Sequence, residues 1–463
     1  MRSINPATEE VTAEYPDHTP AQVESLLKEA RSAFERWAVT SIESRGHVMR
    51  RAAGVLRERS VELSSLMTRE MGKPITQSEA EIEKCAGCCE HFADHAARYL
   101  AQETIASDAD HSYIRYDPLG AVLAIMPWNF PFWQVIRFAA PALMAGNVGV
   151  LKHAPNVPGC AIAIERVFAD AGFPPGVLST LLVDAGAVEG IINNPTIQAV
   201  TLTGSNRAGM AVASEAGRAL KKTVLELGGS DPFIVLGDAD MPAVASAAAS
   251  ARNINSGQSC IAAKRFIVVG NAEPFTTEFV RAVLKMKVGD PTDRSVEIGP
   301  LARLDLLENL HAQVERSVAS GAKLLAGGHR LPRRGFFYAP TVLGEVRPGI
   351  AAFDEETFGP VAPIISARDE DEAVELANQS VYGLGASIWT RDLALAEQLA
   401  ARIDSGSVFI NGPVKSDSRL PFGGIKQSGY GRELSQHGIR EFVNIKTVWT
   451  RSDRARVETS QSE

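Results

Sequence analysis

Hydrophobic and polar positions in the first hundred residues follow a helical period. Thr19, Pro20 and Gln22 stand in the order of an N-cap, a first helical position and a capping-box residue. Apolar residues then recur every three or four positions, at Val23, Leu26, Leu27, Ala30, Ala33, Phe34 and Trp37. This spacing predicts a helix that begins at Pro20. We expect helix to continue over 45–71, and a third helix to cover about 75–100.

Near residue 113 the pattern changes to short strands. Residues 113–116 and 121–125 are predicted strands on either side of the turn Asp117-Pro118-Leu119-Gly120. Buried strands then alternate with helices, and this alternation is typical of a parallel α/β sheet. Strands are predicted at 148–152, 199–203 and 233–236, helices at 160–171 and 207–216, and strands of a second α/β series after Ser259 at 265–269 and 407–410.

Length and composition narrow the class of protein. A chain of 463 residues exceeds one ordinary hydrophobic core, so two or three domains are expected. The net charge of −8 offers no basic field for nucleic acid or anionic lipid. The N-terminus has no apolar signal region, and the apolar run 121–136 is too short to cross a bilayer. Five cysteines in so long a chain do not form a disulfide framework, and we expect a cytoplasmic protein with no nucleic-acid or membrane partner.

Cys260 is the first candidate for chemistry. It stands in the stretch Asn-Ser-Gly-Gln-Ser-Cys-Ile-Ala over 255–262. A cysteine among small and polar residues differs from a packing cysteine, which usually has apolar neighbours. The stretch is consistent with a nucleophile beside an open backbone, or with a half-buried structural cysteine.

Two further segments each carry one polar residue suited to catalysis. Glu226 ends a strand-like run and precedes Gly228 and Gly229. Such a carboxylate projects from a strand end, where burial raises the pKa into the range of a general base, although an exposed charge is the commoner case. Asn129 lies between Pro127 and Pro131, and its amide is suited to stabilising an oxyanion or to packing at a domain corner.

Two other motifs are weaker. In 201–209 a strand runs through Gly204 and Ser205 into a helix, whose N-terminus could hold a pyrophosphate, but the spacing is not that of a Rossmann fingerprint. Residues 85–95 contain three cysteines and two histidines. No second ligand pair follows at zinc-finger spacing, so we interpret them as helix packing and predict no metal.

Taken together, these segments resemble the NAD(P)-dependent aldehyde dehydrogenase superfamily. The matching motifs occur in family order along almost the whole chain: PWNFP at 127–131, LKHAP at 151–155, TGS at 203–205, LELGG at 225–229, GQSC at 257–260, EETFGP at 355–360 and PFGGIKQSGYGRE at 421–433. The resemblance implies an α/β fold with a Rossmann-like cofactor domain, a catalytic α/β domain and a β arm for oligomerisation. On this basis we expect the cofactor domain at 1–106 and 127–228, the catalytic domain at 229–427, the arm at 107–126 and 428–452, and a polar, disordered tail at 453–463.

The resemblance also implies catalytic roles. Cys260 matches the nucleophile that attacks an aldehyde carbonyl, forming a thiohemiacetal and then a thioester. The Asn129 amide and the Cys260 backbone N–H match the oxyanion site, and Glu226 matches the base that activates water for hydrolysis. A second cysteine that some members carry for a redox switch is replaced here by Ala262.

For the cofactor, the resemblance implies NAD or NADP. Lys152 matches a lysine that reaches the adenosine ribose, and Gly204 and Ser205 match the pyrophosphate site. The nicotinamide side matches Glu356, Phe358 and Trp128. Pro155 stands where many members carry a glutamate that repels a 2′-phosphate and others a serine. Either cofactor therefore fits, and we expect NAD because no extra phosphate donor is visible, although Lys152 and His153 could supply charge.

The segment after PWNFP resembles bacterial succinate-semialdehyde dehydrogenases. If 133–137 is helical, Trp133 and Arg137 share a face, and we expect both to contact the substrate. The resemblance implies that Arg137 and Ser416, rather than Ser418, bind a substrate carboxylate, whereas an arginine paired with an acid is the structural alternative. The expected reaction oxidises succinic semialdehyde to succinate in 4-aminobutyrate breakdown. Glutarate semialdehyde or a simple aliphatic aldehyde stays open as substrate.

Other functions and the assembly follow from the same resemblance. A cysteine-dependent esterase or a catalytically silent structural member are the rival functions, and the joint presence of Cys260, Glu226 and Asn129 argues against the second. A phosphorylated aldehyde would need more cations than Arg137 alone. Residues 113–125 and 441–449 are β-rich and apolar, which suits an arm that extends a neighbour's sheet. We expect a homodimer or homotetramer.

Overall fold

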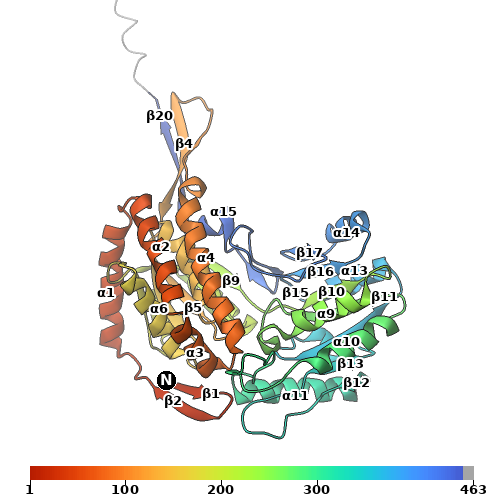
Figure 1. The fold of residues 1–463 in the computed structure, drawn as a ribbon. Coiled ribbons are helices and arrows are strands. Elements are labelled where there is room, and N and C mark those ends of the chain that lie inside the picture. The colour runs from red at the N-terminus through yellow and green to blue at the C-terminus, as the bar shows by residue number, and fades with distance from the viewer. Residues whose placement is uncertain (452–463) are drawn as a thin grey trace, which may run out of the picture.

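The first hundred residues form four helices after a small hairpin, in a computed structural model that describes residues 1–451 (Figure 1). The hairpin is β1 Arg2–Asn5 with β2 Glu10–Glu14, and the helices are α1 Pro20–Trp37, α2 Ile42–Glu58, α3 Ser60–Met71 and α4 Ile75–Tyr99. The predicted capping box is confirmed, because Thr19 Oγ1 accepts from the Gln22 N–H at 3.3 Å and the Gln22 side chain accepts from the Thr19 N–H at 2.8 Å.

The predicted continuous helix over 45–71 is wrong. It begins three residues earlier, where Ser41 Oγ accepts from the Ser44 N–H at 3.2 Å. It is interrupted at Arg59, whose backbone leaves the helical region (φ −97°, ψ 12°). The break lets α3 change direction and pack against β1 and against a later helix, α6 Pro158–Asp170. Packing of an apolar face therefore overrides the local helical preference.

A six-stranded sheet follows, and it is parallel except at one edge. Its order is β19 Gly429–Tyr430, β9 Lys222–Glu226, β8 Ile197–Thr203, β5 Ala121–Met126, β6 Val148–His153 and β7 Leu178–Thr180, with β19 antiparallel. Helices α5 Trp133–Met144, α6, α7 Val188–Asn193 and α8 Asn206–Arg218 connect the strands. The chain runs outward from β5 to β7 and then returns to β8 beside β5. In such doubly wound sheets ligands bind at the carboxyl ends of the strands.

The second half of the chain forms a seven-stranded sheet. Its order is β12 Lys323–Ala326, β13 Thr341–Gly344, β14 Val361–Ala367, β11 Ala263–Val269, β10 Asp231–Val235, β16 Ala386–Trp389 and β17 Val408–Ile410, with only β12 antiparallel. Its main helices are α9 Met241–Asn253, α10 Glu273–Lys285, α11 Leu304–Ala319, α13 Glu370–Asn378 and α14 Leu393–Ala400. Alternate residues of β10 enter two different apolar clusters. Helices therefore cover both faces of this sheet, as parallel sheets require.

Short elements complete the described chain. They are η1 Ile254–Gly257, α12 Ala351–Asp354, β15 Tyr382–Gly383 paired with β18 Ile425–Lys426, and α15 Ser435–Ile439. Residues 452–463, which include the predicted tail at 453–463, lie outside the described residues. No helix within residues 1–451 is long and apolar enough to cross a membrane.

A third sheet projects from the body as an arm (Figure 1). It contains β20 Val443–Thr450, β4 His111–Pro118 and β3 Glu103–Thr104. The expectation that 107–126 belongs wholly to the arm is wrong, because β5 at its end pairs with β6 and β8 in the six-stranded sheet. Five of the six β5 side chains are buried, which a projecting arm cannot provide. The turn at 117–120 therefore joins two sheets instead of closing a hairpin.

Candidate active site

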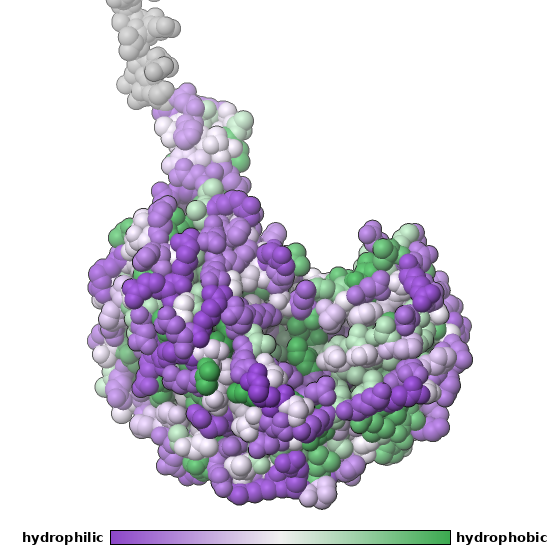
Figure 2. All heavy atoms as spheres, viewed as in Figure 1, coloured by the Kyte–Doolittle hydropathy of each residue, from purple (hydrophilic) through white to green (hydrophobic). Residues whose placement is uncertain are grey.

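The two large sheets bring the predicted site residues together at facing edges. The carboxyl ends of β5, β6, β8 and β9 lead to Trp128 and Asn129, Lys152, Ser205, and Glu226. The loops that enter the amino ends of β11 and β14 carry Cys260 and Glu356. Figure 2 shows the molecular surface hollowed between the two halves. The site thus lies where a carboxyl edge of one sheet meets an amino edge of the other.

The loop before Cys260 has a strained backbone. Asn255 and Ser256 are non-glycine residues with φ of 51° and 56°, a left-handed conformation that costs free energy and persists only where the surroundings enforce it. Arg252, which is 1% exposed, donates to the carbonyls of Gly257 at 3.2 Å and Thr357 at 2.9 Å. Gly257 (φ 76°) packs so closely that a Cβ would lie 2.3 Å from the Gly359 carbonyl oxygen. The glycine of the GQSC motif therefore permits contact between two site loops.

Cys260 is held with its thiol half-buried. Lys264 Nζ donates to the carbonyls of Ser259 at 2.8 Å and Cys260 at 2.7 Å, which fixes the backbone from one side. Within residues 1–451, the Cys260 N–H makes no hydrogen bond and is available to an incoming oxygen. Burial raises the pKa of the thiol to about 12, so the free protein holds a neutral thiol that needs a base.

Glu226 is buried, with 2% of its surface exposed, and neither carboxyl oxygen has a hydrogen-bond partner within residues 1–451. Burial raises the pKa of this carboxyl to about 8, and the nearby Arg137 opposes the rise. The alternative of an exposed strand-end charge is wrong, because β9 is an interior strand between β8 and β19. A carboxyl group with these properties exchanges protons near neutral pH.

Asn129 is also buried, at 5% exposure. Its Nδ2 donates to the Gln258 carbonyl at 3.1 Å, and its own backbone carbonyl accepts from Asn255 Nδ2 at 2.6 Å. The amide is therefore joined to the strained cysteine loop from two sides. One Nδ2–H is left for another acceptor, since the amide nitrogen carries two hydrogens.

Lys152 and its neighbours form one end of a candidate cofactor site. Lys152 lies at 8% exposure without an ion-pair partner within residues 1–451, and burial lowers its pKa. His153 cannot add charge, because its Nδ1 accepts from the Ala154 N–H at 2.8 Å and its Nε2 donates to the Pro131 carbonyl at 2.9 Å. Burial lowers the pKa of His153 to about 4, so the expectation that it could supply charge is wrong. Pro155 is exposed beside them.

The other predicted cofactor residues lie across the site. Ser205 Oγ accepts from the Ala208 N–H at 3.3 Å and caps α8, whose N-terminus provides a weak positive potential. Glu356 Oε1 accepts from the Gly229 N–H at 3.1 Å and lies 3.1 Å from Lys264 Nζ. The rings of Trp128 and Phe358 meet edge to face at 5.8 Å. Two aromatic rings, an unpaired lysine and a helix N-terminus suit a planar, anionic dinucleotide.

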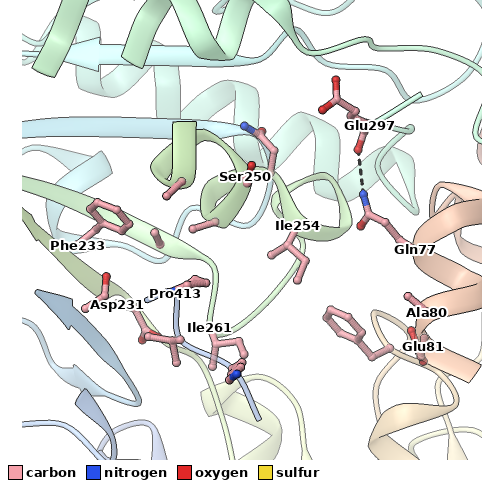
Figure 3. Close-up of a pocket in the computed structure, with 18 of the residues that line it drawn as sticks. Gln77, Ala80, Glu81, Asp231, Phe233, Ser250, Ile254, Ile261, Glu297 and Pro413 are labelled. Atoms are coloured by element: carbon pink, nitrogen blue, oxygen red, sulfur yellow. Dashed lines mark hydrogen bonds between the residues drawn. The ribbon is translucent and has the colours of Figure 1, made fainter. Parts of the chain in front are cut away.

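A cavity of about 540 Å³ opens between α4 and α9, with Gln77, Ala80 and Glu81 on the α4 side and Ser250 on the α9 side (Figure 3). Trp133 also lines this cavity. Its lining includes Phe130 and Ile261, which are the sequence neighbours of Asn129 and Cys260. Trp133 Nε1 donates to Ser416 Oγ at 3.0 Å, so two of the three predicted substrate residues are in contact. Ser418 has a different neighbour, because its backbone carbonyl accepts from the Ser435 N–H.

Arg137 has a different environment from the one that the substrate prediction required. It is 2% exposed and forms an ion pair with the buried Glu433. It also donates to Thr203 Oγ1 at 3.3 Å and lies 4.6 Å from the centre of the Phe422 ring. The structure therefore gives Arg137 the acid partner that we considered as its alternative role. Glu433 was not identified from the sequence, although it falls inside the PFGGIKQSGYGRE motif.

Sequence reasoning also missed Lys84 and Glu81 on α4. Gln77, Ala80, Glu81 and Lys84 line the cavity at helical spacing, which puts them on one face. The sequence did contain a signal for them, because the charged residues Glu81 and Lys84 fall on a helix face that also carries buried positions. By contrast, Cys85, Cys88 and Cys89 pack in the apolar core, where burial raises the pKa of each thiol.

The assembled residues can carry out acyl chemistry at sulfur. A half-buried thiol, a buried carboxyl group that titrates near neutral pH, and a backbone N–H with an amide donor are the parts of a covalent mechanism with an oxyanion site. The adjoining candidate cofactor residues suit a dinucleotide, and the cavity suits a small, partly apolar substrate.

Comparison with known proteins agrees with this geometry. The profile of the Aldehyde dehydrogenase family matches residues 1–448. Succinate semialdehyde dehydrogenase [NAD(P)+] Sad of Escherichia coli is 51% identical over 96% of this chain and 97% of its own. Succinate-semialdehyde dehydrogenase [NADP(+)] 1 of Mycobacterium tuberculosis is 48% identical over 97% and 99%. Among solved structures, succinic semialdehyde dehydrogenase from Streptococcus pyogenes in complex with NADP+ is 35% identical, with a TM-score of 0.95 over 97% of this chain and all of that one.

Proposed function

The chain belongs to the aldehyde dehydrogenase family, and we propose that it oxidises succinic semialdehyde to succinate with NAD or NADP. The observation that carries this proposal is the 51% identity, over nearly the full length of both chains, with an enzyme named for that substrate. Support comes from the cavity, whose wall places the polar side chains of Trp133 and Lys84 among apolar residues, both of them hydrogen-bonded to Ser416. Such a wall suits an aldehyde with a polar far end.

Cys260 acts as the nucleophile in this proposal. Glu226 as carboxylate takes the thiol proton, and the sulfur bonds to the aldehyde carbon. The carbonyl oxygen becomes an oxyanion that the Cys260 N–H and the free Asn129 amide hydrogen stabilise. Because both donors are fixed by the cysteine loop, they need no reorganisation as the charge develops.

The same carboxyl group serves in the second half of the reaction. After oxidation, the sulfur carries the acyl group as a thioester. Glu226 first releases to solvent the proton that it took from the thiol. It then accepts a proton from water, the water oxygen bonds to the acyl carbon, the C–S bond breaks, and the proton passes to the leaving sulfur, which gives the acid and the thiol. Burial of Glu226 keeps its pKa near the pH at which it must exchange protons.

The cofactor would lie between Lys152 and the α8 N-terminus at one end and Glu356, Phe358 and Trp128 at the other. When bound, its nicotinamide accepts the hydride that the substrate carbon loses. The unpaired, buried Lys152 is the observation that fits an anionic or hydroxyl-rich group there. Glu356, held by Gly229 and Lys264, would orient the ribose on the nicotinamide side.

We infer that both NAD and NADP are accepted. The preference for NAD that the sequence suggested finds no support in the names of the relatives, which specify NAD(P) or NADP. Pro155 carries no charge that would repel a 2′-phosphate. Pro155→Glu should lower kcat/KM for NADP by about tenfold, since like charges repel, and leave that for NAD unchanged. The neutral Pro155→Gln variant controls for loss of the ring, and an equal loss with both cofactors would contradict the inference.

Initial rates test the substrate assignment. Cofactor reduction at 340 nm is followed with succinic semialdehyde, glutarate semialdehyde and butyraldehyde, each with NAD and with NADP. The proposal requires the highest kcat/KM for succinic semialdehyde. Preference for butyraldehyde would leave a general aliphatic aldehyde dehydrogenase, and ester hydrolysis without cofactor reduction would favour the esterase alternative. In either case Cys260→Ala should abolish turnover while cofactor binding stays measurable by fluorescence.

We propose a homodimer, or a homotetramer built from dimers. The arm leaves the body and exposes apolar side chains, with Ile445 at 62% and Trp449 at 45%. In the other half of the molecule, β17 is an open edge of the seven-stranded sheet, and its three residues are only half-buried. An open edge and an unsupported arm both gain from pairing with a second copy. Within this assembly we retain the division into a cofactor domain, a catalytic domain and an arm.

A further inference from the structure

Two polar groups that line the cavity, Lys84 and Trp133, meet at a shared acceptor, Ser416, which follows the lining residue Lys415 in the chain. Lys84 Nζ of α4 donates to Ser416 Oγ at 2.7 Å, and Trp133 Nε1 of α5 donates to the same oxygen at 3.0 Å. The lysine also lies over the Trp133 ring, 4.2 Å from its centre. Ser416 follows β17 and is 6% exposed. Helices α4 and α5 and the loop after β17 therefore form a polar corner beside the cavity.

Several hydrogen-bond donors at this corner have no acceptor within residues 1–451. Ser416 Oγ accepts two hydrogen bonds, so its hydroxyl hydrogen is directed to a third group, and none is present within residues 1–451. Lys84 carries three N–H donors and uses one of them on Ser416. The corner thus offers several donors and needs an acceptor.

The charges around Lys84 also favour a negatively charged ligand. Lys84 forms no ion pair within residues 1–451, whereas Glu81, the acid one turn earlier on α4, is paired with Lys73. Burial lowers the pKa of Lys84 to about 8, and the charge of Arg137 adds to this effect. At neutral pH the ammonium is still mostly protonated, and it lacks a paired negative charge, because the other carboxyl groups in the lining, Asp231 and Glu297, form no ion pair with it within residues 1–451. A carboxylate would supply that charge and accept from the unused donors.

The remaining walls fit the rest of a short substrate. Phe130, Phe233, Ile254 and Ile261 are apolar and line the same cavity. Ile261 and Phe130 adjoin the nucleophile and the oxyanion amide in sequence. A short methylene chain with a carboxylate at one end matches this distribution of apolar and polar wall.

We propose that Lys84, which Ser416 and Trp133 hold in place, binds the carboxylate of the semialdehyde substrate, and that Arg137 does not. Arg137 already holds the carboxylate of Glu433, and a substrate would have to displace it. This inference rests on the proposed function, because it names the residue that selects a carboxylated aldehyde. Lys84 is a specificity residue that contacts the end of the substrate remote from the reacting carbon.

Kinetics of the full-length protein with NADP test this role. Lys84→Met should raise KM for succinic semialdehyde by about 10- to 100-fold, the range for one charge-assisted hydrogen bond, and leave KM for butyraldehyde unchanged. Lys84→Arg should recover part of the loss. Lys415→Met is the matched control, because Lys415 lines the same cavity but is exposed, and within residues 1–451 its ammonium makes no hydrogen bond to Ser416. Equal losses with both aldehydes, or no loss with either, would overturn the proposal.

A binding measurement separates this proposal from the substrate assignment. Succinate is used as a competitive inhibitor of butyraldehyde oxidation in the wild type, Lys84→Met and Lys415→Met. Weaker inhibition only in Lys84→Met supports the carboxylate site even if succinic semialdehyde is a poor substrate. A wild type that prefers butyraldehyde would refute the proposed function alone. Equal inhibition of all three proteins, or none of the wild type, would refute the role of Lys84.

Discussion

Glu226 shows how surroundings set the working pH of a single residue. The carboxyl group is buried, and its pKa lies near 8 instead of near 4.5. Its base form is the carboxylate, which predominates above pH 8 and is protonated below it. We therefore expect kcat to rise between pH 6.5 and pH 8.5 with an apparent pKa near 8 when hydrolysis limits the rate.

Glu226→Gln provides the comparison for this profile. The amide keeps the shape of the side chain but cannot accept a proton, so kcat should fall by about 10²- to 10⁴-fold at every pH and the slope should disappear. Rates are measured with saturating aldehyde and cofactor in buffers of constant ionic strength. A variant that keeps the wild-type profile would assign the titrating group elsewhere.

Arg137 behaves differently from an exposed charge because its partner is buried too. Removing it leaves Glu433 without its counter-ion, and breaking a buried pair costs about 3–5 kcal/mol. Arg137→Met should therefore lower the melting temperature and impair succinic semialdehyde and butyraldehyde alike. Differential scanning fluorimetry and parallel kinetics test this. A loss of activity confined to the carboxylated aldehyde, at unchanged melting temperature, would instead mean that Arg137 binds the substrate.

At the scale of elements, the start of α5 depends on a side chain from α4. Glu81 Oε1 accepts from the backbone N–H groups of Phe132 at 3.0 Å and Trp133 at 2.9 Å, at a helix start that has no cap of its own. The other oxygen is paired with Lys73, which lies 3.7 Å from the Phe130 ring centre. One buried carboxylate thus positions the loop of Asn129 and the helix of Trp133.

Glu81→Gln tests this positioning. The amide oxygen can still accept from the helix, but Lys73 is left buried and unpaired, so the free energy of unfolding should fall by about 3–5 kcal/mol. Urea denaturation measures the change. Glu79→Gln, which breaks an exposed pair with Arg294 on the same helix, should leave stability unchanged. If Glu81→Gln lowered the free energy of unfolding no more than Glu79→Gln, the buried pair with Lys73 would not contribute to stability.

Element types could largely be predicted, but their limits depend on packing. The capping box at Thr19 and the strands at 148–152 and 199–203 were visible because local chemistry and burial pattern agree there. The break at Arg59 has no Gly or Pro signal in the sequence, since it is decided by the surface on which α3 packs. Likewise, the turn at 117–120 could not reveal that its two strands join different sheets.

At the scale of the whole molecule, the arm should control assembly. Deleting 443–463 removes β20, whose eight residues pair with β4. We expect the truncated chain to elute with the mass of one chain, and the full chain with twice or four times that mass, in size-exclusion chromatography with light scattering. Deleting only 452–463 should keep the oligomer. A monomeric full chain would contradict the assembly proposal.

The sequence by itself determined the chemistry available to this protein. Cys260, Glu226 and Asn129 stand in motifs whose residue types and order identify the family, and this information is local to short stretches. Only the tertiary structure decided which charges meet. Arg137 and Glu433 are far apart in the chain, as are Lys84 and Ser416, and no periodicity links them. Partners of this kind are fixed when two sheets and α4 pack around one cavity. A buried charge is costly unless it is paired, so it is paired with another residue of the chain or with a bound ligand.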